Sequence, residues 1–270
     1  SSEQKAEGGG KGKIFRKASS VAVAHSKALD AGKVPLGLKL QFALFDRLVL
    51  SKIRAALGGR VKYAVSGSAP LGLFLGHFYR SLGLTILEGY GLTETTAPIT
   101  VNLPSNFKIG KVGPPLPGCA VRIAADGEIE AKGINIFDGY WKNEKATKET
   151  FDGEWFKTGD IGTIDEDGYV QITGRKKEMI VTAGGKNVAP ATLEDPIRAN
   201  PIVGQIVVVG DKRPFIGALI SLDEEMLPVW LNNNGEDPTM TIEQASTNPK
   251  VLAEIQSAID RANSKVSRAE

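Results

Sequence analysis

The sequence predicts an α/β fold joined to an α+β region, on three observations. Apolar residues recur at helical spacing in the N-terminal part, short β-type runs separated by Gly, Pro and Asp follow, and a new mixture of strands and helices begins near residue 174. With 270 residues, 41% hydrophobic and 24% charged, the chain can bury a core. A net charge of +2 gives no reason to expect nucleic acid as a partner.

The N-terminal region is expected to form part of a large parallel sheet with its helices. The elements are a polar loop at 1–13, helices at 14–29 and 36–57, a strand at 61–65, a helix at 71–82 and a strand at 84–87. A strand, a helix and a second strand in this order are typical of a parallel sheet. Ligands of such sheets bind beyond the carboxyl ends of the strands.

The first predicted helix is basic. Its region carries Lys11, Lys13, Arg16, Lys17 and Lys27. A solvated helix face is the favoured interpretation, and peripheral association with the inner surface of a membrane is the alternative. No apolar run approaches the ~18 residues that span a bilayer. The single cysteine, Cys119, fits a reducing compartment, so a cytoplasmic location is expected.

Two turns of small residues follow the two predicted strands, at 66–70 and 88–98. In the second turn, Gly89 and Gly91 allow the backbone to approach a ligand closely, and Tyr90 offers a flat face to a base. Its polar side chains are suited to phosphate and Mg²⁺: Thr93, Glu94, Thr95 and Thr96. A turn built from Gly and Thr for conformational reasons is the alternative. Because both turns lie at carboxyl ends of strands, we favour a nucleotide site.

Residues 109–173 are expected to form a small antiparallel, barrel-like subdomain. Asp126-Gly127 and Asp167-Gly168 are strong hairpin signals between its strands. Charge interrupts the β pattern near residue 174, where we place the start of a small, mobile α+β domain over 174–270. The predicted organisation is therefore 1–108, 109–173 and 174–270.

Four segments in fixed order resemble one superfamily. They are Ser66-Gly-Ser-Ala-Pro70, Tyr90-Gly-Leu-Thr-Glu-Thr95, Trp155-Phe-Lys-Thr-Gly-Asp160, and Gly174-Arg-Lys-Lys-Glu178 with Val181-Thr-Ala-Gly-Gly-Lys-Asn-Val188. The set is similar to the adenylate-forming (AMP-binding) enzymes, and residues 152–190 are most similar to the long-chain fatty acyl-CoA synthetases. The resemblance implies activation of a fatty acid by ATP through an acyl-adenylate, followed by transfer to CoA.

Site roles follow from the resemblance. The implied nucleotide site consists of Gly67, Ser68, Ala69, Gly89, Tyr90, Gly91, Thr93, Asp160, Ile172 and Arg175. Tyr90 would stack on adenine and Asp160 would accept both ribose hydroxyls. The implied catalytic residues are Thr93, Glu94, Arg175 and Lys177. Thr93 would contact the α-phosphate, Glu94 would hold Mg²⁺, and Lys177 would serve as a domain hinge.

A flexible loop is implied for the second half-reaction. Gly184, Gly185 and Lys186 match the family's loop that approaches CoA. The segment differs from a phosphate-cradling kinase loop, because Asn187 stands where that loop has a hydroxyl residue. A dinucleotide enzyme is excluded because the glycine-rich segment at residue 89 lacks the third glycine of that fingerprint.

Two family features have no match in the sequence. The phosphate-gripping Ser/Thr/Gly loop is not found between residues 1 and 65, and Lys265 lacks the context of the family's C-terminal catalytic lysine. We therefore expect a C-terminal portion of a larger synthetase with weak or no adenylation activity, and exposed apolar edges that allow dimerisation. A non-catalytic AMP-binding or regulatory module is the alternative.

Overall fold

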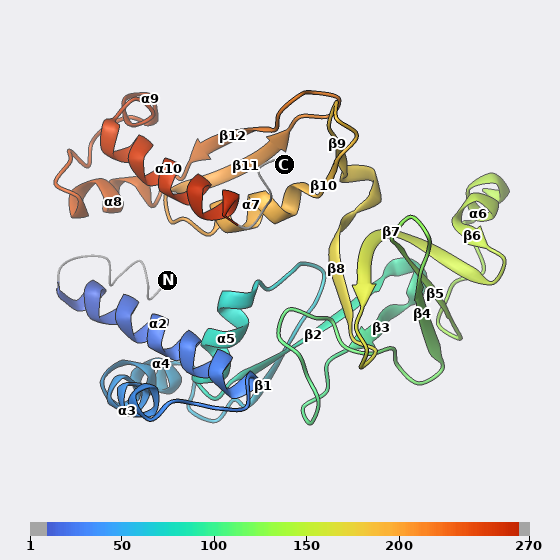
Figure 1. The fold of residues 1–270 in the computed structure, drawn as a ribbon, viewed down its shortest axis with the longest axis horizontal. Coiled ribbons are helices and arrows are strands. Elements are labelled where there is room, and N and C mark those ends of the chain that lie inside the picture. Colours follow the sequence, from blue (N-terminus) through green and yellow to red (C-terminus); the bar gives the residue numbers. More distant parts are fainter. Residues whose placement is uncertain (1–9, 265–270) are drawn as a thin grey trace. The chain divides into compact units, whose positions relative to one another are not determined.

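The computed structural model describes residues 10–264 and has a mixed α/β architecture, which confirms the predicted fold class. The chain divides into two compact units, one of residues 14–172 and one of residues 1–13 with 173–270. Figure 1 shows the elements of both units in chain order. Each unit is described by itself below.

Helices form the first part of the 14–172 unit. They are α2 (Gly10–Asp30), α3 (Leu36–Phe45), the π-helix η1 (Asp46–Leu50) and α4 (Ser51–Ala56). The loop predicted at 1–13 is wrong for residues 10–13, where α2 has already begun, and its other residues lie outside the described part. The helix predicted at 36–57 is present. Its π-helical segment η1 was not predicted, and Leu50 at the end of η1 is buried in the core.

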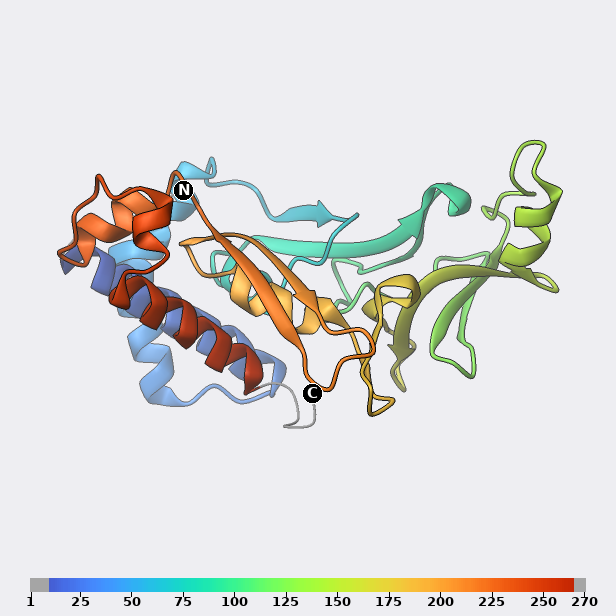
Figure 2. The same ribbon diagram turned by 90° about the horizontal axis from the view of Figure 1, so that it is seen from above.

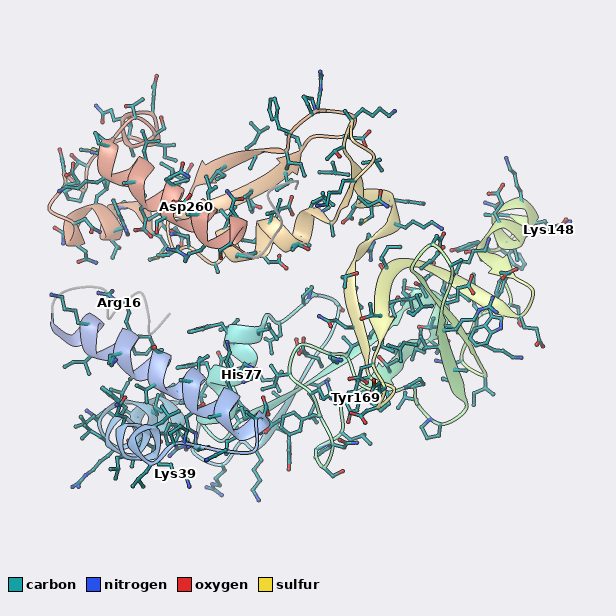
Figure 3. All side chains as sticks on the ribbon, viewed as in Figure 1. Arg16, Lys39, His77, Lys148, Tyr169 and Asp260 are labelled. Atoms are coloured by element: carbon teal, nitrogen blue, oxygen red, sulfur yellow. The ribbon has the colours of Figure 1, made fainter. Side chains whose placement is uncertain are left out.

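Helix α2 is amphipathic, which explains its position. Ala18, Val21 and Ala22 on one face are buried, whereas the basic side chains of Arg16 and Lys17 are exposed. The buried face meets α5 (Leu73–Ser81) at a polar contact, where Ser26 Oγ and His77 Nδ1 lie 3.0 Å apart. Figure 3 labels His77 on α5. Among the described residues, no helix is long and apolar enough to cross a membrane.

A three-stranded sheet carries the first part of the candidate site. Strand β1 (Tyr63–Ser66) pairs in parallel with β2 (Thr85–Leu92), and β2 pairs antiparallel with β3 (Ala97–Val101). The predicted strand–helix–strand unit is confirmed. Strand β1 is an edge of this sheet, and its Val65 is 77% exposed.

The turn predicted at 88–98 is wrong for its first half. Strand β2 continues through Leu92, and only the short 3₁₀ helix η2 (Thr93–Thr95) and Thr96 separate it from β3. The physical reason is the backbone of β3, which approaches so closely that a Cβ on Gly91 would lie 2.0 Å from the Ala97 carbonyl oxygen. Glycine here permits strand pairing and does not break the strand.

A curled five-stranded sheet follows, and its residues up to Ile172 belong to the same unit. Its elements are β4 (Cys119–Ile123), β5 (Glu128–Gly133), α6 (Glu144–Thr150), β6 (Phe151–Asp152), β7 (Trp155–Ile164) and β8 (Val170–Arg175). The strand order is β4-β5-β7-β6, with β8 also paired to β7. Both predicted hairpins are present, with Gly127 and Gly168 at positive φ. The shared core joins Tyr90 and Ile99 of the first sheet to Ile129 and Phe156 of this one.

The remaining unit is an α+β structure. It contains η3 (Lys176–Glu178), β9 (Ile180–Val181), β10 (Asn187–Val188), α7 (Pro190–Arg198), β11 (Val203–Val209), β12 (Gly217–Leu222), α8 (Leu227–Asn233), α9 (Ile242–Ala245) and α10 (Pro249–Asn263). Figures 1 and 2 show α7 and α10 on one face of the β11–β12 hairpin. Leu193 and Ile197 of α7 pack there with Ile206 and Ala258. Lys265 lies outside the described residues.

Candidate nucleotide-binding site

The two small-residue segments predicted to border a nucleotide lie side by side. Parallel pairing sets Ser66, the last residue of β1, opposite Glu88 of β2, and β2 continues beyond this pair to Leu92. Beyond β1, a Cβ on Gly67 would lie 3.6 Å from the carbonyl oxygen of Gly89. Gly67, Ser68 and Ala69 are exposed, and Ser68 has the left-handed φ of 68°. This edge therefore presents an exposed backbone turn beside β2.

Tyr90 and Asp160 meet directly, although 70 residues separate them. The Tyr90 hydroxyl donates a hydrogen bond of 2.5 Å to Asp160 Oδ2, and the two residues are only 8% and 4% exposed. The Tyr90 ring packs into the shared core. Little of the ring surface is therefore exposed for the predicted stacking on adenine. The bond fixes the orientation of one carboxylate oxygen of Asp160.

The loop after β2 is shaped by Thr95, which is fully buried. The Thr95 hydroxyl lies 2.8 Å from the Leu92 amide nitrogen and 2.8 Å from the Ala97 carbonyl oxygen, accepting from the first and donating to the second. These main-chain contacts use the hydroxyl, so the phosphate role predicted for Thr95 is wrong. Thr93 and Thr96 are exposed, and Thr96 has a positive φ of 51°.

Glu94 is half-buried in η2 and contacts an exposed tyrosine. Tyr140 Oη donates to Glu94 Oε1 at 2.9 Å, and the Glu94 carbonyl oxygen accepts from the Phe137 amide at 2.8 Å. Partial burial, followed by the Glu94 carboxylate, raises the pKa of Tyr140. Within residues 10–264, no three acidic, His or Cys side chains gather as a metal cluster. A lone carboxylate nevertheless suits Mg²⁺, which keeps water and phosphate oxygens as its other ligands.

Glu88 was not predicted as part of the site. Its buried carboxylate accepts hydrogen bonds of 3.3 Å from the Leu71 amide on Oε1 and of 3.3 Å from the Gly110 amide on Oε2. Burial raises the pKa of Glu88, and the two amide donors oppose that shift. Glu88 thus ties the turn after β1 to the loop before β4. An acid inside an apolar strand is the sequence signal that could have identified it.

The remaining predicted residues follow β7. Ile172 on β8 is half-buried and packs against the shared core. Arg175 ends β8, and Lys177 lies in η3; both side chains are exposed. Both residues belong to the unit that contains residues 173–270.

The predicted CoA loop is the tip of the β9–β10 hairpin. Gly184 and Gly185 are exposed, and Gly185 has a φ of 77°. Thr182 closes the tip, because its amide donates to the Lys186 carbonyl oxygen at 3.0 Å and its own carbonyl accepts from the Gly185 amide at 2.8 Å. An exposed hairpin tip is a suitable place for contact with a ligand.

Comparison with known proteins gives consistent results for both units. Residues 26–141 match the family described as AMP-binding enzyme, and residues 177–270 match the AMP-binding enzyme C-terminal domain. The chain is 54% identical to the long-chain-fatty-acid–CoA ligase FadD15 of Mycobacterium bovis over 268 residues, which is 99% of this chain. The chain spans 45% of the length of that relative.

Solved structures show the same fold. An ATP-bound RpMatB-BxBclM chimera is 31% identical, with a TM-score of 0.60 over 83% of this chain and 44% of the other. The anthranilate CoA ligase AuaEII, in complex with anthranoyl-AMP, has a TM-score of 0.58 at 24% identity, over 77% of this chain and 39% of the other. The motifs, the fold and these matches agree: the chain belongs to the AMP-binding, adenylate-forming enzymes.

Proposed function

We propose that this chain supplies the AMP-binding part of an ATP-dependent long-chain fatty acid–CoA ligase. The observation that carries the proposal is the buried Tyr90–Asp160 hydrogen bond, which joins two of the family's motifs at the carboxyl end of β2. The name of the relative with 54% identity supports the long-chain fatty acid as the substrate class.

Each residue of the site has a defined task in this proposal. The backbone turn of Gly67, Ser68 and Ala69 borders the adenine. Gly89 and Gly91 lack side chains, so the β2 backbone can lie close to the nucleotide. Asp160 accepts the two ribose hydroxyls, because an ionised carboxylate is the stronger acceptor for paired donors. Thr93 donates to the α-phosphate. Charge that develops there is offset by positioned donors and cations, which is the main source of catalysis in such sites.

Glu94 is the residue that would hold Mg²⁺. The bound ion would supply positive charge that offsets the negative charge of the phosphates. The Tyr140 hydroxyl, 2.9 Å from Glu94 Oε1, orients that carboxylate before a nucleotide binds. The chain's own contribution is therefore one carboxylate held in a fixed rotamer by a neighbouring donor.

The remaining roles belong to residues after 172. In this proposal, Ile172 borders the nucleotide, Arg175 reaches the ribose and phosphate, and Lys177 is the hinge about which a domain of residues 174–270 turns. The hairpin tip at Gly184, Gly185 and Lys186 approaches CoA. A division into 1–108, 109–173 and 174–270 is part of the same proposal.

We place this activity in the cytoplasm. The exposed basic face of α2, with Arg16 and Lys17, would support peripheral association with an anionic membrane surface. Such a location suits an enzyme whose substrate is a long acyl chain. A dimer that covers the exposed apolar edge at β1 is part of the same proposal.

The proposal is tested with mimics of the reaction intermediate. Titration calorimetry of the 270-residue chain would compare AMP with non-hydrolysable acyl sulfamoyl adenosines that carry 8, 12 or 16 carbons. We expect AMP to bind, and affinity to rise with chain length. Equal affinity for all three mimics and AMP would instead favour a nucleotide-binding regulatory module, and absence of binding would refute the proposed nucleotide site.

A further inference from the structure

We propose that Glu128 is a positioning residue for Asp160: its buried carboxylate holds the amide of Gly159, the residue before Asp160, and so sets the direction of the ribose-binding carboxylate. The inference rests on the proposed role of Asp160. It assigns a task to a charged residue that none of the recognised motifs contains.

Glu128 lies at the start of β5 and is 5% exposed. Its Oε1 accepts a hydrogen bond of 2.8 Å from the amide of Gly159. Gly159 lies inside β7 but has a φ of 76°, a left-handed conformation that glycine adopts without strain. A buried carboxylate that accepts from a main-chain amide is a strong and directional restraint on that peptide.

The restrained peptide leads directly to Asp160. The Asp160 amide donates to Thr158 Oγ1 at 3.1 Å, and the Thr158 hydroxyl donates to the Ile129 carbonyl oxygen at 2.7 Å. Thr158 and Glu128 therefore anchor the irregular segment of β7 to β5, one through the Ile129 carbonyl oxygen and the other at the Gly159 amide. With the backbone fixed in this way, Tyr90 meets Asp160 Oδ2 from β2.

A neighbouring glutamate on β5 is equally buried but has a different partner. Glu130, two residues along β5, is 4% exposed and forms a 2.5 Å ion pair with Arg122, which also stacks on Trp155. Arg122 also bonds Asp152, so the Glu130 carboxylate serves to tie β5 to β4 and β6. Glu130 is therefore a matched control, with the same residue type, strand and burial.

The experiment compares AMP with 2′-deoxy-AMP by titration calorimetry on the 270-residue chain. If Asp160 accepts both ribose hydroxyls, the wild-type chain should prefer AMP by about tenfold, the effect of one hydrogen bond to a charged acceptor. Glu128→Ala should reduce this preference to less than about twofold, whereas Glu128→Gln, which keeps one acceptor oxygen, should retain most of it. Glu130→Ala should retain the preference even where it lowers the melting temperature.

An unchanged preference for AMP in folded Glu128→Ala would overturn the proposal. If that variant does not fold, Glu128→Asp replaces it, since the shorter side chain keeps the charge but does not reach the Gly159 amide, and it should lose the preference. If the wild-type chain binds no AMP, the proposed function fails, and amide hydrogen exchange then decides the positioning role alone. Exchange at Gly159 and Asp160 should be at least about tenfold faster in the Glu128 variant than in Glu130→Ala; equal rates would overturn it.

Discussion

The candidate site has two parts that differ in how completely the protein holds them. The proposed ribose corner, made of Tyr90, Glu128, Thr158 and Asp160, is mostly buried and its polar groups are already hydrogen-bonded. The proposed phosphate corner, made of Thr93, Glu94 and Tyr140, is largely exposed, with one exposed bond between side chains. Both corners are on strands or loops of the same unit.

Under the proposed function, the rigid corner would recognise the nucleotide and the exposed corner would take part in the reaction. A ribose is the same before and after the reaction, so a rigid corner loses little by being preorganised. The α-phosphate changes geometry and charge, and its groups must adjust as substrates bind and leave. We therefore expect mutations in the ribose corner to affect stability and binding together, and mutations of side chains in the phosphate corner to leave stability almost unchanged.

The largest effect is expected from the backbone that carries the phosphate corner. Gly91→Ala would place a Cβ 2.0 Å from the Ala97 carbonyl oxygen and separate β2 from β3. We expect a loss of about 3 kcal/mol or more in the free energy of unfolding, measured by urea denaturation. Gly67→Ala is the control, because its Cβ would meet only the Gly89 carbonyl oxygen, at 3.6 Å. Equal effects of the two variants would contradict the account of β2.

Two matched tyrosine variants compare the corners directly. Tyr90→Phe removes the buried donor to Asp160, and we expect a loss of about 2 kcal/mol in the free energy of unfolding, because hydrogen bonds to charged groups are among the stronger ones. Tyr140→Phe removes an exposed bond to Glu94 and should cost less than about 0.5 kcal/mol. Similar losses for the two variants would show that the corners are equally organised.

A pH profile tests the buried carboxylate that links the loops of the site. Because burial raises the pKa of Glu88 above its ordinary value of 4.5, the unfolded chain releases this proton at a lower pH than the folded chain does. The contribution of Glu88 to stability is therefore present below pH 4.5 and is lost as the pH rises from there through the folded pKa. Melting temperatures of Glu88→Gln should decline less than those of the wild type over this interval. Parallel profiles would rule out a raised pKa.

The smallest effect is expected for magnesium dependence of AMP binding. Glu94→Gln should leave the affinity for AMP without Mg²⁺ within about threefold of the wild type, since a single half-exposed carboxylate is altered. Enhancement of binding by Mg²⁺ should be reduced, because a neutral amide is a weaker ligand for a hard cation. Titrations with and without the metal measure both, and an unaltered enhancement would remove Glu94 from the metal site.

Local patterns predicted much of the fold. The parallel pairing of β1 with β2 followed from a strand, a helix and a strand in order, and the Asp-Gly hairpins of the curled sheet followed from their turn chemistry. The strand through Leu92 was missed because Gly89 and Gly91 were taken to indicate a turn, whereas they admit the backbone of β3. The identity of a glycine does not distinguish these two uses.

The site was predictable as a set of motifs but not as a set of contacts. Thr95 was expected to face phosphate, yet its hydroxyl satisfies the main chain of its own turn. The bond between Tyr90 and Asp160, and the support of Gly159 by Glu128, join residues 70 and 31 positions apart. Such pairs depend on the packing of β2 and β5 against β7, for which local sequence carries no signal.

Calorimetric titration of AMP into the wild-type chain and into Asp160→Asn tests the central assignment most directly. The variant keeps the shape of the side chain but replaces a charged acceptor of two hydroxyls by a neutral amide. We predict saturable binding by the wild type and affinity lower by about 100-fold in the variant. Equal affinity of the two proteins would contradict the assignment of this corner to the ribose.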